Sequence, residues 1–211
     1  MEKTRIYMVR HGQSQANERD VFLGHTDLDL TQKGRDQALV TAEYLSKIPV
    51  DCIYSSDLKR AYHTAQTTAE RLGMPIVKEE NLREIFCGEW ENQPFEKLEV
   101  EYKESYGTWL QNIDEAYPEQ GESVLQLKER VIAVLEKIAK ENLGKTVFLF
   151  SHATPIRCFA AYCKGVCVKD LSWVSNASVS YFEYENGSFS LVEYGKDDFL
   201  GVAVTSLPQN V

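Results

Sequence analysis

Two of the four histidines in the sequence lie just behind short apolar runs that predict β-strands. His11 follows residues 6–9 and His152 follows residues 146–150, each with one residue between. In a parallel α/β sheet the carboxyl ends of the strands meet at one edge, which is where sites form. A single histidine there has an ordinary alternative as a hydrogen-bonded packing residue. Two of them, one adjoining Arg10, favour a functional site at this edge.

Arg60 gives an independent indication of an anion site. The sequence predicts it in the first turn of a helix capped by Ser56 or Asp57. The helix dipole disfavours a cation there by about 0.3 to 1 kcal/mol, unless the helix end and the guanidinium face one anion. Together with Arg10 it would supply two planar forks suited to phosphoryl oxygens. The alternative is a solvated surface arginine beside Lys59.

The elements that must position these residues alternate between short apolar runs and longer segments of helical period, which is typical of βαβ units. Strands are predicted at residues 6–9, 50–54, 75–78 and 146–150, helices at 32–48, 58–72, 123–138 and 155–163, and short helices within 92–120. The runs 179–184 and 189–194 flank an Asn-Gly pair and predict a hairpin. We therefore expect a three-layer α/β/α sandwich, with a mostly parallel central sheet and an antiparallel edge, in a single domain over residues 1–211.

The composition argues against several classes of protein. With 23 basic and 32 acidic residues the net charge is −9, which disfavours binding to nucleic acid or to an anionic membrane surface. No apolar run approaches the roughly 20 residues of a membrane helix. The five cysteines are scattered, unlike a secreted disulfide framework, and their spacing does not resemble a zinc site. We expect a cytoplasmic protein without metal, nucleic-acid or membrane partners.

Several short blocks along the chain, in this order, resemble the histidine phosphatase superfamily, which includes the cofactor-dependent phosphoglycerate mutases and related phosphatases. The blocks are Arg10-His11-Gly12, Asn17, residues 56–61, Leu82-Arg83-Glu84, Gly121-Glu122-Ser123 and Ser151-His152. The resemblance extends from about residue 4 to residue 200. It implies the phosphoglycerate mutase-like fold.

The resemblance also implies a role for each matching residue. His11 would be the nucleophile that becomes a phosphohistidine, since a neutral imidazole nitrogen can attack phosphorus near pH 7. Arg10, Arg60 and His152, as a protonated or neutral donor, would hold the phosphoryl oxygens. Asn17 would add a neutral donor. Positioning and electrostatics are most of what phosphoryl transfer requires, so no metal or other cofactor is implied.

Glu84 would protonate the leaving alcohol and then accept a proton from the attacking water. The first task requires a protonated carboxyl, so we expect its pKa to be raised by burial or by a neighbouring phosphate. The alternative for Glu84 is a surface carboxylate paired with Arg83. Glu89 is the other candidate acid in this segment.

The expected pocket has two walls. Residues 22–24 would form the first, in which Leu23 and Gly24 are candidate substrate-binding residues. Phe86 and Trp90 would form the second, although aromatic residues at such places more often belong to a core.

The sequence departs from the mutases of this superfamily and favours hydrolysis. Residues 86–90 resemble the phosphatase branches, and residues 90–121 are shorter than the insertion that encloses a bisphosphorylated cofactor in mutases. Ala153 replaces the glycine that usually follows the second histidine, a change expected only to adjust the pocket wall. We predict a metal-independent phosphomonoesterase, monomeric or homodimeric, acting on a small metabolite with one phosphate. The alternatives are a cofactor-dependent phosphoglycerate mutase and a non-catalytic, phosphate-dependent binding protein.

Overall fold

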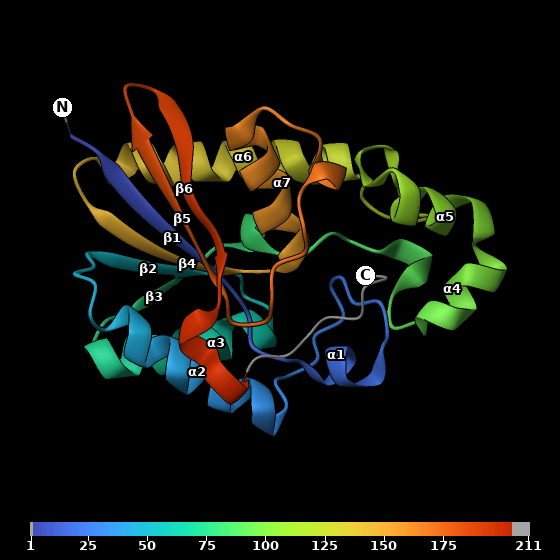
Figure 1. The fold of residues 1–211 in the computed structure, drawn as a ribbon, viewed down its shortest axis with the longest axis horizontal. Coiled ribbons are helices and arrows are strands. Elements are labelled where there is room, and N and C mark those ends of the chain that lie inside the picture. The colour runs from blue at the N-terminus through green and yellow to red at the C-terminus, as the bar shows by residue number, and fades with distance from the viewer. Residues whose placement is uncertain (1, 204–211) are drawn as a thin grey trace.

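Residues 2–203 are described by the computed structural model, and their strands form one sheet in the order β3-β2-β4-β1-β5-β6 (Figure 1). The strands are β1 (Thr4–Arg10), β2 (Cys52–Ser55), β3 (Ile76–Lys78), β4 (Thr146–Ser151), β5 (Val179–Glu185) and β6 (Ser188–Lys196). The first four strands in the sheet order pair in parallel, whereas β5 and β6 pair antiparallel at one edge. The expected mixed sheet is confirmed.

Helices cover both faces of this sheet (Figure 1). The helices on one face are α2 (Gln32–Leu45) and α3 (Lys59–Leu72), and those on the other are α6 (Val124–Glu141) and α7 (Ala153–Lys164) (Figure 1). The remaining α-helices of the described residues are α1 (Gln15–Arg19), α4 (Phe95–Glu101) and α5 (Lys103–Gln111). Every residue of β4 is buried, and its side chains alternate between the two cores because successive strand residues point to opposite faces. Val147 and Leu149 belong to the core that includes residues of α6 and α7, and Phe148 and Phe150 to the core that includes residues of α2 and α3. The three-layer α/β/α sandwich is confirmed.

Two local signals in the sequence are confirmed in detail. The side chain of Ser123 accepts a hydrogen bond from the backbone N–H of Gln126, whose own side chain reaches back to the N–H of Ser123, so α6 begins with a capping box. Asn186 and Gly187 both have positive φ, at 54° and 81°, as a two-residue hairpin turn of this kind requires. This turn joins β5 to β6.

The predicted cap of α3 is wrong. Leu58 is the N-cap residue and its own side chain makes no capping hydrogen bond, while the backbone N–H of Lys59, the first residue of the helix, donates to Oδ1 of Asp27 at 2.7 Å. Asp57 instead forms an ion pair with Arg83, and the hydroxyl of Ser56 lies 2.9 Å from Nε2 of His152. Both polar side chains thus have partners far along the chain, and the carboxylate of Asp27 accepts at the helix start in their place. Arg60 does lie in the first turn of α3, as expected.

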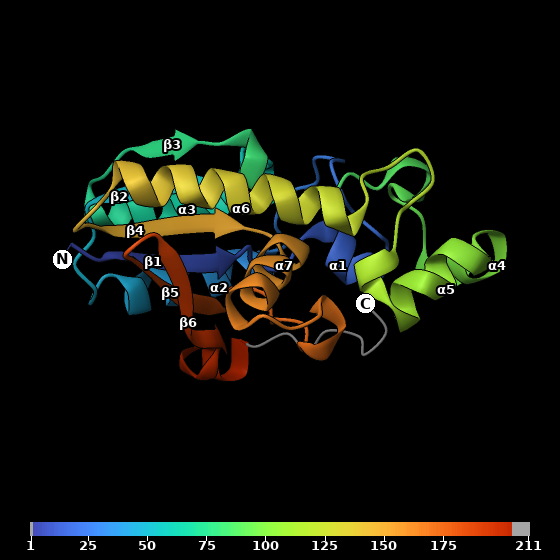
Figure 2. The same ribbon diagram turned by 90° about the horizontal axis from the view of Figure 1, so that it is seen from above.

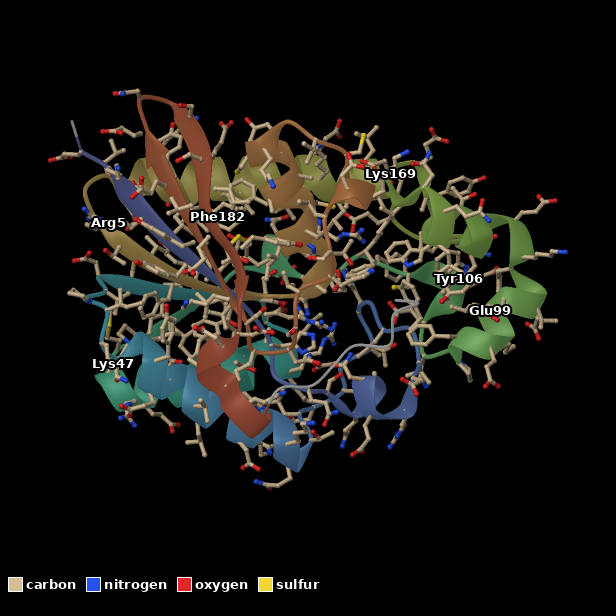
Figure 3. All side chains as sticks on the ribbon, in the orientation of Figure 1. Arg5, Lys47, Glu99, Tyr106, Lys169 and Phe182 are labelled. Atoms are coloured by element: carbon tan, nitrogen blue, oxygen red, sulfur yellow. The ribbon has the colours of Figure 1, made fainter. Side chains whose placement is uncertain are left out.

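Short helices between Trp90 and Gly121 extend from one end of the molecule, beyond the carboxyl ends of the parallel strands (Figure 2). Aromatic side chains hold them there. The ring of Trp90 packs edge-on against Tyr106 at 5.4 Å, and Tyr106 is labelled on α5 in Figure 3. The indole N–H of Trp90 donates to Glu119 at 2.7 Å. Within residues 2–203, no helix is both long and apolar enough to cross a membrane.

Candidate active site

The carboxyl ends of β1 and β4 bring His11 and His152 together. Their ring centroids are 5.1 Å apart, and both side chains are buried. The backbone N–H of His11 donates to the carbonyl of Ser151 at 3.1 Å, so the two strand ends are tied where the chain leaves the sheet. The pairing of neighbouring parallel strands therefore places two histidines 141 positions apart in sequence within one site.

The tautomer of His11 is set by its backbone. Its Nδ1 lies 2.7 Å from the carbonyl oxygen of Gly12, which can only accept, so Nδ1 carries the proton and Nε2 keeps its lone pair. Burial lowers the pKa of His11 well below its usual value, and the positive charges of Arg60 and Arg10 add to this effect. His11 is thus a neutral imidazole near pH 7, as a nitrogen nucleophile must be.

Arg10 and Arg60 bring two buried positive charges to the same place. Arg10 donates from Nη1 to the carbonyl of Val174 at 2.6 Å, and its buried Nε has no partner among the described residues. Arg60 donates to the carbonyls of Gly24, at 2.7 Å, and Thr26, at 3.2 Å. Burial lowers the pKa of both, that of Arg10 to about 10. Within residues 2–203 neither forms a salt bridge with a carboxylate, an arrangement that an anion would complete.

His152 adds an unused polar atom to this cluster. Its Nε2 contacts the hydroxyl of Ser56, while its buried Nδ1 has no partner among the described residues. Burial lowers the pKa of His152 well below its usual value, with contributions from Arg60 and His11. Without an anion the ring is therefore neutral, and a bound anion would favour the protonated form.

Glu84 is a buried carboxyl group, only 8% exposed, and not the surface group of the alternative interpretation. It accepts hydrogen bonds from the backbone N–H groups of Ile85 at 2.9 Å and Thr154 at 3.4 Å. Burial nevertheless raises its pKa above the usual value, as a general acid requires. The proposed pairing with Arg83 is absent, because Arg83 forms a two-pronged ion pair with Asp57.

An arginine on α6 fixes the backbone of the segment that carries Glu84. Arg130 donates to the carbonyls of Asn81 at 2.8 Å, Arg83 at 3.2 Å and Glu84 at 3.3 Å. Its guanidinium is held in turn by the carboxylate of Glu122 at 2.7 Å. The position of Glu84 thus depends on a helix about 45 residues further along the chain.

Arg10, His11, Arg60 and Glu84 line one pocket of about 530 Å³, a volume that includes its opening to solvent. His152 lies behind them against the ring of His11 and is not itself a lining residue. The lining residues are Arg10, His11, Ser14, Asn17, Val21, Phe22, Leu23, Arg60, Glu84, Phe95, Trp109, Ala153, Thr154 and Trp173. Asn17 accepts at Oδ1 from the backbone N–H of Ser14 and from Asn176, so its amide Nδ2 is the atom available to donate to a ligand. The pocket therefore combines a neutral imidazole, two guanidinium groups, an amide donor and a buried carboxyl group.

The family of the chain follows from a sequence comparison. A model of the histidine phosphatase superfamily (branch 1) matches residues 6–197, which include every residue of the pocket. The chain belongs to this superfamily. The resemblance inferred from the ordered motifs is confirmed, and the arrangement of strands and helices agrees with it.

Known relatives of this histidine phosphatase are similar along most of its length. It is 32% identical to phosphoserine phosphatase 1 of Hydrogenobacter thermophilus over 89% of this chain and 85% of the relative. It is 28% identical to an adenosylcobalamin/alpha-ribazole phosphatase of Salmonella typhimurium over 90% of each chain. The solved structure of Bacillus stearothermophilus YhfR superposes with a TM-score of 0.90 at 25% identity, covering 93% of this chain and 99% of that one. The phosphatase names among these relatives support a phosphatase.

The structure agrees only in part with the first of the two walls expected for the pocket. Leu23 lines the pocket, but Gly24 does not. Gly24 packs behind Arg60, where a Cβ atom would collide with the carbonyl of Ile85 and the carboxylate of Glu91. Its close approach to that backbone requires glycine, and its contribution is the carbonyl that holds Arg60.

Phe86 and Trp90 do not line the pocket of this histidine phosphatase. Phe86 is 41% exposed and Trp90 is fully buried, packed against Phe22. The tryptophans that do line the pocket are Trp109 and Trp173. Both come from segments in which no local pattern marked a site, so the sequence offered no signal for them. Glu89, the other candidate acid, is exposed and bonded to Gln120, outside the pocket.

Glu91 is a supporting residue that sequence reasoning missed. Its carboxylate accepts hydrogen bonds from the backbone N–H groups of Gly24 at 3.2 Å, His25 at 2.6 Å and Thr26 at 3.1 Å. The carbonyls of Gly24 and Thr26 in this same loop hold the guanidinium of Arg60. Glu91 therefore fixes the loop that aims Arg60 into the pocket.

Replacing Glu91 with glutamine places an amide NH₂ among backbone donors that need acceptors. We expect the free energy of unfolding to fall by about 1.5 to 3 kcal/mol, since hydrogen bonds to a charged group are lost. We also expect the Kd for inorganic phosphate to rise about tenfold, because Arg60 loses its fixed position. Urea denaturation and phosphate titration measure both. Glu89→Gln, two residues away and exposed, is the matched control, and equal effects in the two variants would contradict this role.

Proposed function

We propose that this histidine phosphatase hydrolyses a small phosphomonoester without a metal ion, through a phosphohistidine at Nε2 of His11. One observation carries the proposal. A neutral imidazole with a free Nε2 shares its pocket with two buried guanidinium groups that have no carboxylate partner in the described chain. A bound phosphoryl group would give the imidazole nitrogen and both guanidinium groups a partner. The two guanidinium groups would also neutralise the charge of the phosphoryl oxygens, which a metal ion neutralises in other phosphoryl-transfer enzymes.

In the first step, Nε2 of His11 attacks phosphorus and the bond between phosphorus and the ester oxygen breaks. Arg10, Arg60 and His152 donate to the phosphoryl oxygens, and Asn17 adds its amide. Glu84 gives its proton to the leaving oxygen, so the product leaves as a neutral alcohol. This step produces the phosphohistidine and an ionised Glu84.

In the second step, water replaces the alcohol. Glu84, now a carboxylate, takes a proton from the water while the water oxygen attacks phosphorus. The bond between phosphorus and Nε2 breaks, and His11 returns to its neutral form with inorganic phosphate as the product. Glu84 is protonated again and ready for the next ester.

The pH dependence of this reaction follows from the two shifted pKa values. His11 must be neutral, and because its pKa is lowered well below 6.5, activity is lost only when the pH falls below that lowered value. Glu84 must be protonated in the free enzyme, and its pKa is raised above 4.5, so activity falls as the pH rises past it. We expect a bell-shaped profile of kcat/KM for ethyl phosphate, with its alkaline limb absent in Glu84→Gln.

The experiment that tests the proposal is phosphate release from ethyl phosphate and p-nitrophenyl phosphate after treatment with EDTA. Undiminished turnover supports the metal-free reaction. Turnover that disappears with EDTA and returns with a divalent cation contradicts it. Interconversion of 2- and 3-phosphoglycerate that depends on added 2,3-bisphosphoglycerate, without phosphate release, would favour the mutase alternative.

The proposal includes a single domain over residues 1–211 in a cytoplasmic monomer or homodimer. All five cysteines are free, as suits a reducing compartment. The net charge of −9 is unfavourable for nucleic acid and for anionic membranes. Light scattering on the purified protein distinguishes the monomer from the dimer.

A further inference from the structure

Large apolar side chains make up much of the pocket lining. They are Val21, Phe22, Leu23, Phe95, Trp109 and Trp173, here called the aromatic wall. The ionisable groups that line the pocket are Arg10, His11, Arg60 and Glu84. Each of them has a part in phosphoryl transfer in the proposed reaction. Among residues 2–203, the pocket lining therefore provides no further charge with which to bind the alcohol.

The rings of the aromatic wall are fixed by their neighbours. Trp109 meets Phe22 edge-on at a centroid distance of 5.0 Å, and it lies 6.1 Å from Trp173 with the two rings inclined by 30°. The guanidinium of Arg157 lies 4.4 Å from the ring centroid of Trp173, a cation–π contact. Arg157 is itself held by the carbonyl of Leu171 at 2.8 Å. The wall is therefore a preformed apolar surface that needs little ordering when a ligand binds.

Charged alcohols fit this wall poorly. The carboxylate of a phosphoglycerate, or the ammonium and carboxylate of phosphoserine, would lose water against Phe22, Leu23 and Trp109 without an ionic partner in the lining. The cation of Arg157 does not line the pocket and packs on the ring of Trp173. An uncharged ring instead gains buried apolar area and offset contacts with the indoles.

We propose that the preferred substrate is the phosphomonoester of an uncharged alcohol that carries an aromatic ring. This inference rests on the proposed function and adds the chemical class of its substrate. It also separates this enzyme from a phosphoserine phosphatase, the activity named for one of its relatives.

The test compares kcat/KM for 2-phenylethyl phosphate, ethyl phosphate, O-phosphoserine and 3-phosphoglycerate. All four are esters of primary alcohols, so differences in the intrinsic reactivity of the ester bond are small. We expect 2-phenylethyl phosphate to exceed ethyl phosphate by about 10- to 100-fold, the range given by burial of one phenyl ring. We expect phosphoserine and 3-phosphoglycerate to fall below ethyl phosphate.

Two variants assign the preference to the aromatic wall. Trp173→Leu and Leu23→Asn should each lower the ratio of 2-phenylethyl to ethyl phosphate by about fivefold or more, since each removes apolar contact area. The ratio corrects for any general loss of activity. Leu39→Asn is the matched control for Leu23→Asn, because Leu39 is 59% exposed on α2 and lies outside the pocket lining. Its ratio should equal that of the wild type.

Different outcomes overturn the substrate class and the proposed function. Equal kcat/KM for 2-phenylethyl and ethyl phosphates, or a preference for phosphoserine, overturns the substrate class and leaves the phosphatase intact. An unchanged ratio in both Trp173→Leu and Leu23→Asn also overturns it. No phosphate release from any of the four esters, by protein whose fold is intact by circular dichroism, overturns the proposed function itself.

Discussion

Replacement of His11 with alanine is expected to lower kcat for phosphate release by at least about 10⁴-fold, the scale seen when a catalytic nucleophile is removed. The variant keeps Arg10, Arg60 and His152, so it should still bind phosphate. It lacks the Nε2 atom that attacks phosphorus in the proposed reaction. Chemical quenching with ³²P-labelled substrate should trap an acid-labile phosphoprotein in the wild type and none in His11→Ala.

The matched control for this variant is His63→Ala. His63 lies on the same helix as Arg60 but outside the pocket, and it pairs with Asp29 at 2.6 Å. We expect its kcat to stay within a factor of about three of the wild type, as for most substitutions remote from a site. Substantial turnover or surviving label in His11→Ala would assign the nucleophile to another residue. Tight phosphate binding without turnover in the wild type would instead favour the binding-protein alternative.

Replacement of Glu84 with glutamine should have the second largest effect, and its size should depend on the leaving group. For an alkyl ester such as ethyl phosphate we expect kcat/KM to fall by about 10²- to 10⁴-fold, the usual contribution of a general acid. For p-nitrophenyl phosphate the fall should be much smaller, because p-nitrophenolate leaves without a proton. Comparison of the two esters in wild type and variant measures this difference.

The same variant should also accumulate the phosphoenzyme. Without the carboxylate that activates water, hydrolysis of the phosphohistidine becomes slow, so p-nitrophenol should appear in a stoichiometric burst followed by a slow steady state. Stopped-flow absorbance measures the burst. Glu89→Gln is the control and should behave as the wild type, since Glu89 is exposed outside the pocket. Equal losses with both esters and no burst would remove Glu84 from the role of acid and base.

The features that sequence alone predicted correctly depend on neighbouring residues. The capping box of Ser123 and Gln126 spans one helical turn, and the turn of Asn186 and Gly187 needs two residues that accept positive φ. The alternation of buried β-strands with helices identified the layers, because apolar periodicity reflects which face is buried. The predicted N-cap of α3 was wrong because its outcome depends on a distant partner. The carboxylate of Asp57 pairs with Arg83, 26 positions away.

The sequence by itself determined the family and the placing of His11 and His152 at one edge of the sheet, since residues just behind parallel strands must meet there. Only the tertiary structure decided which loops close around them. It buried Glu84 away from its neighbour Arg83, and it brought Trp109 and Trp173, and not Phe86 and Trp90, into the pocket lining. Contacts between distant segments depend on how whole elements pack, and no local pattern encodes them.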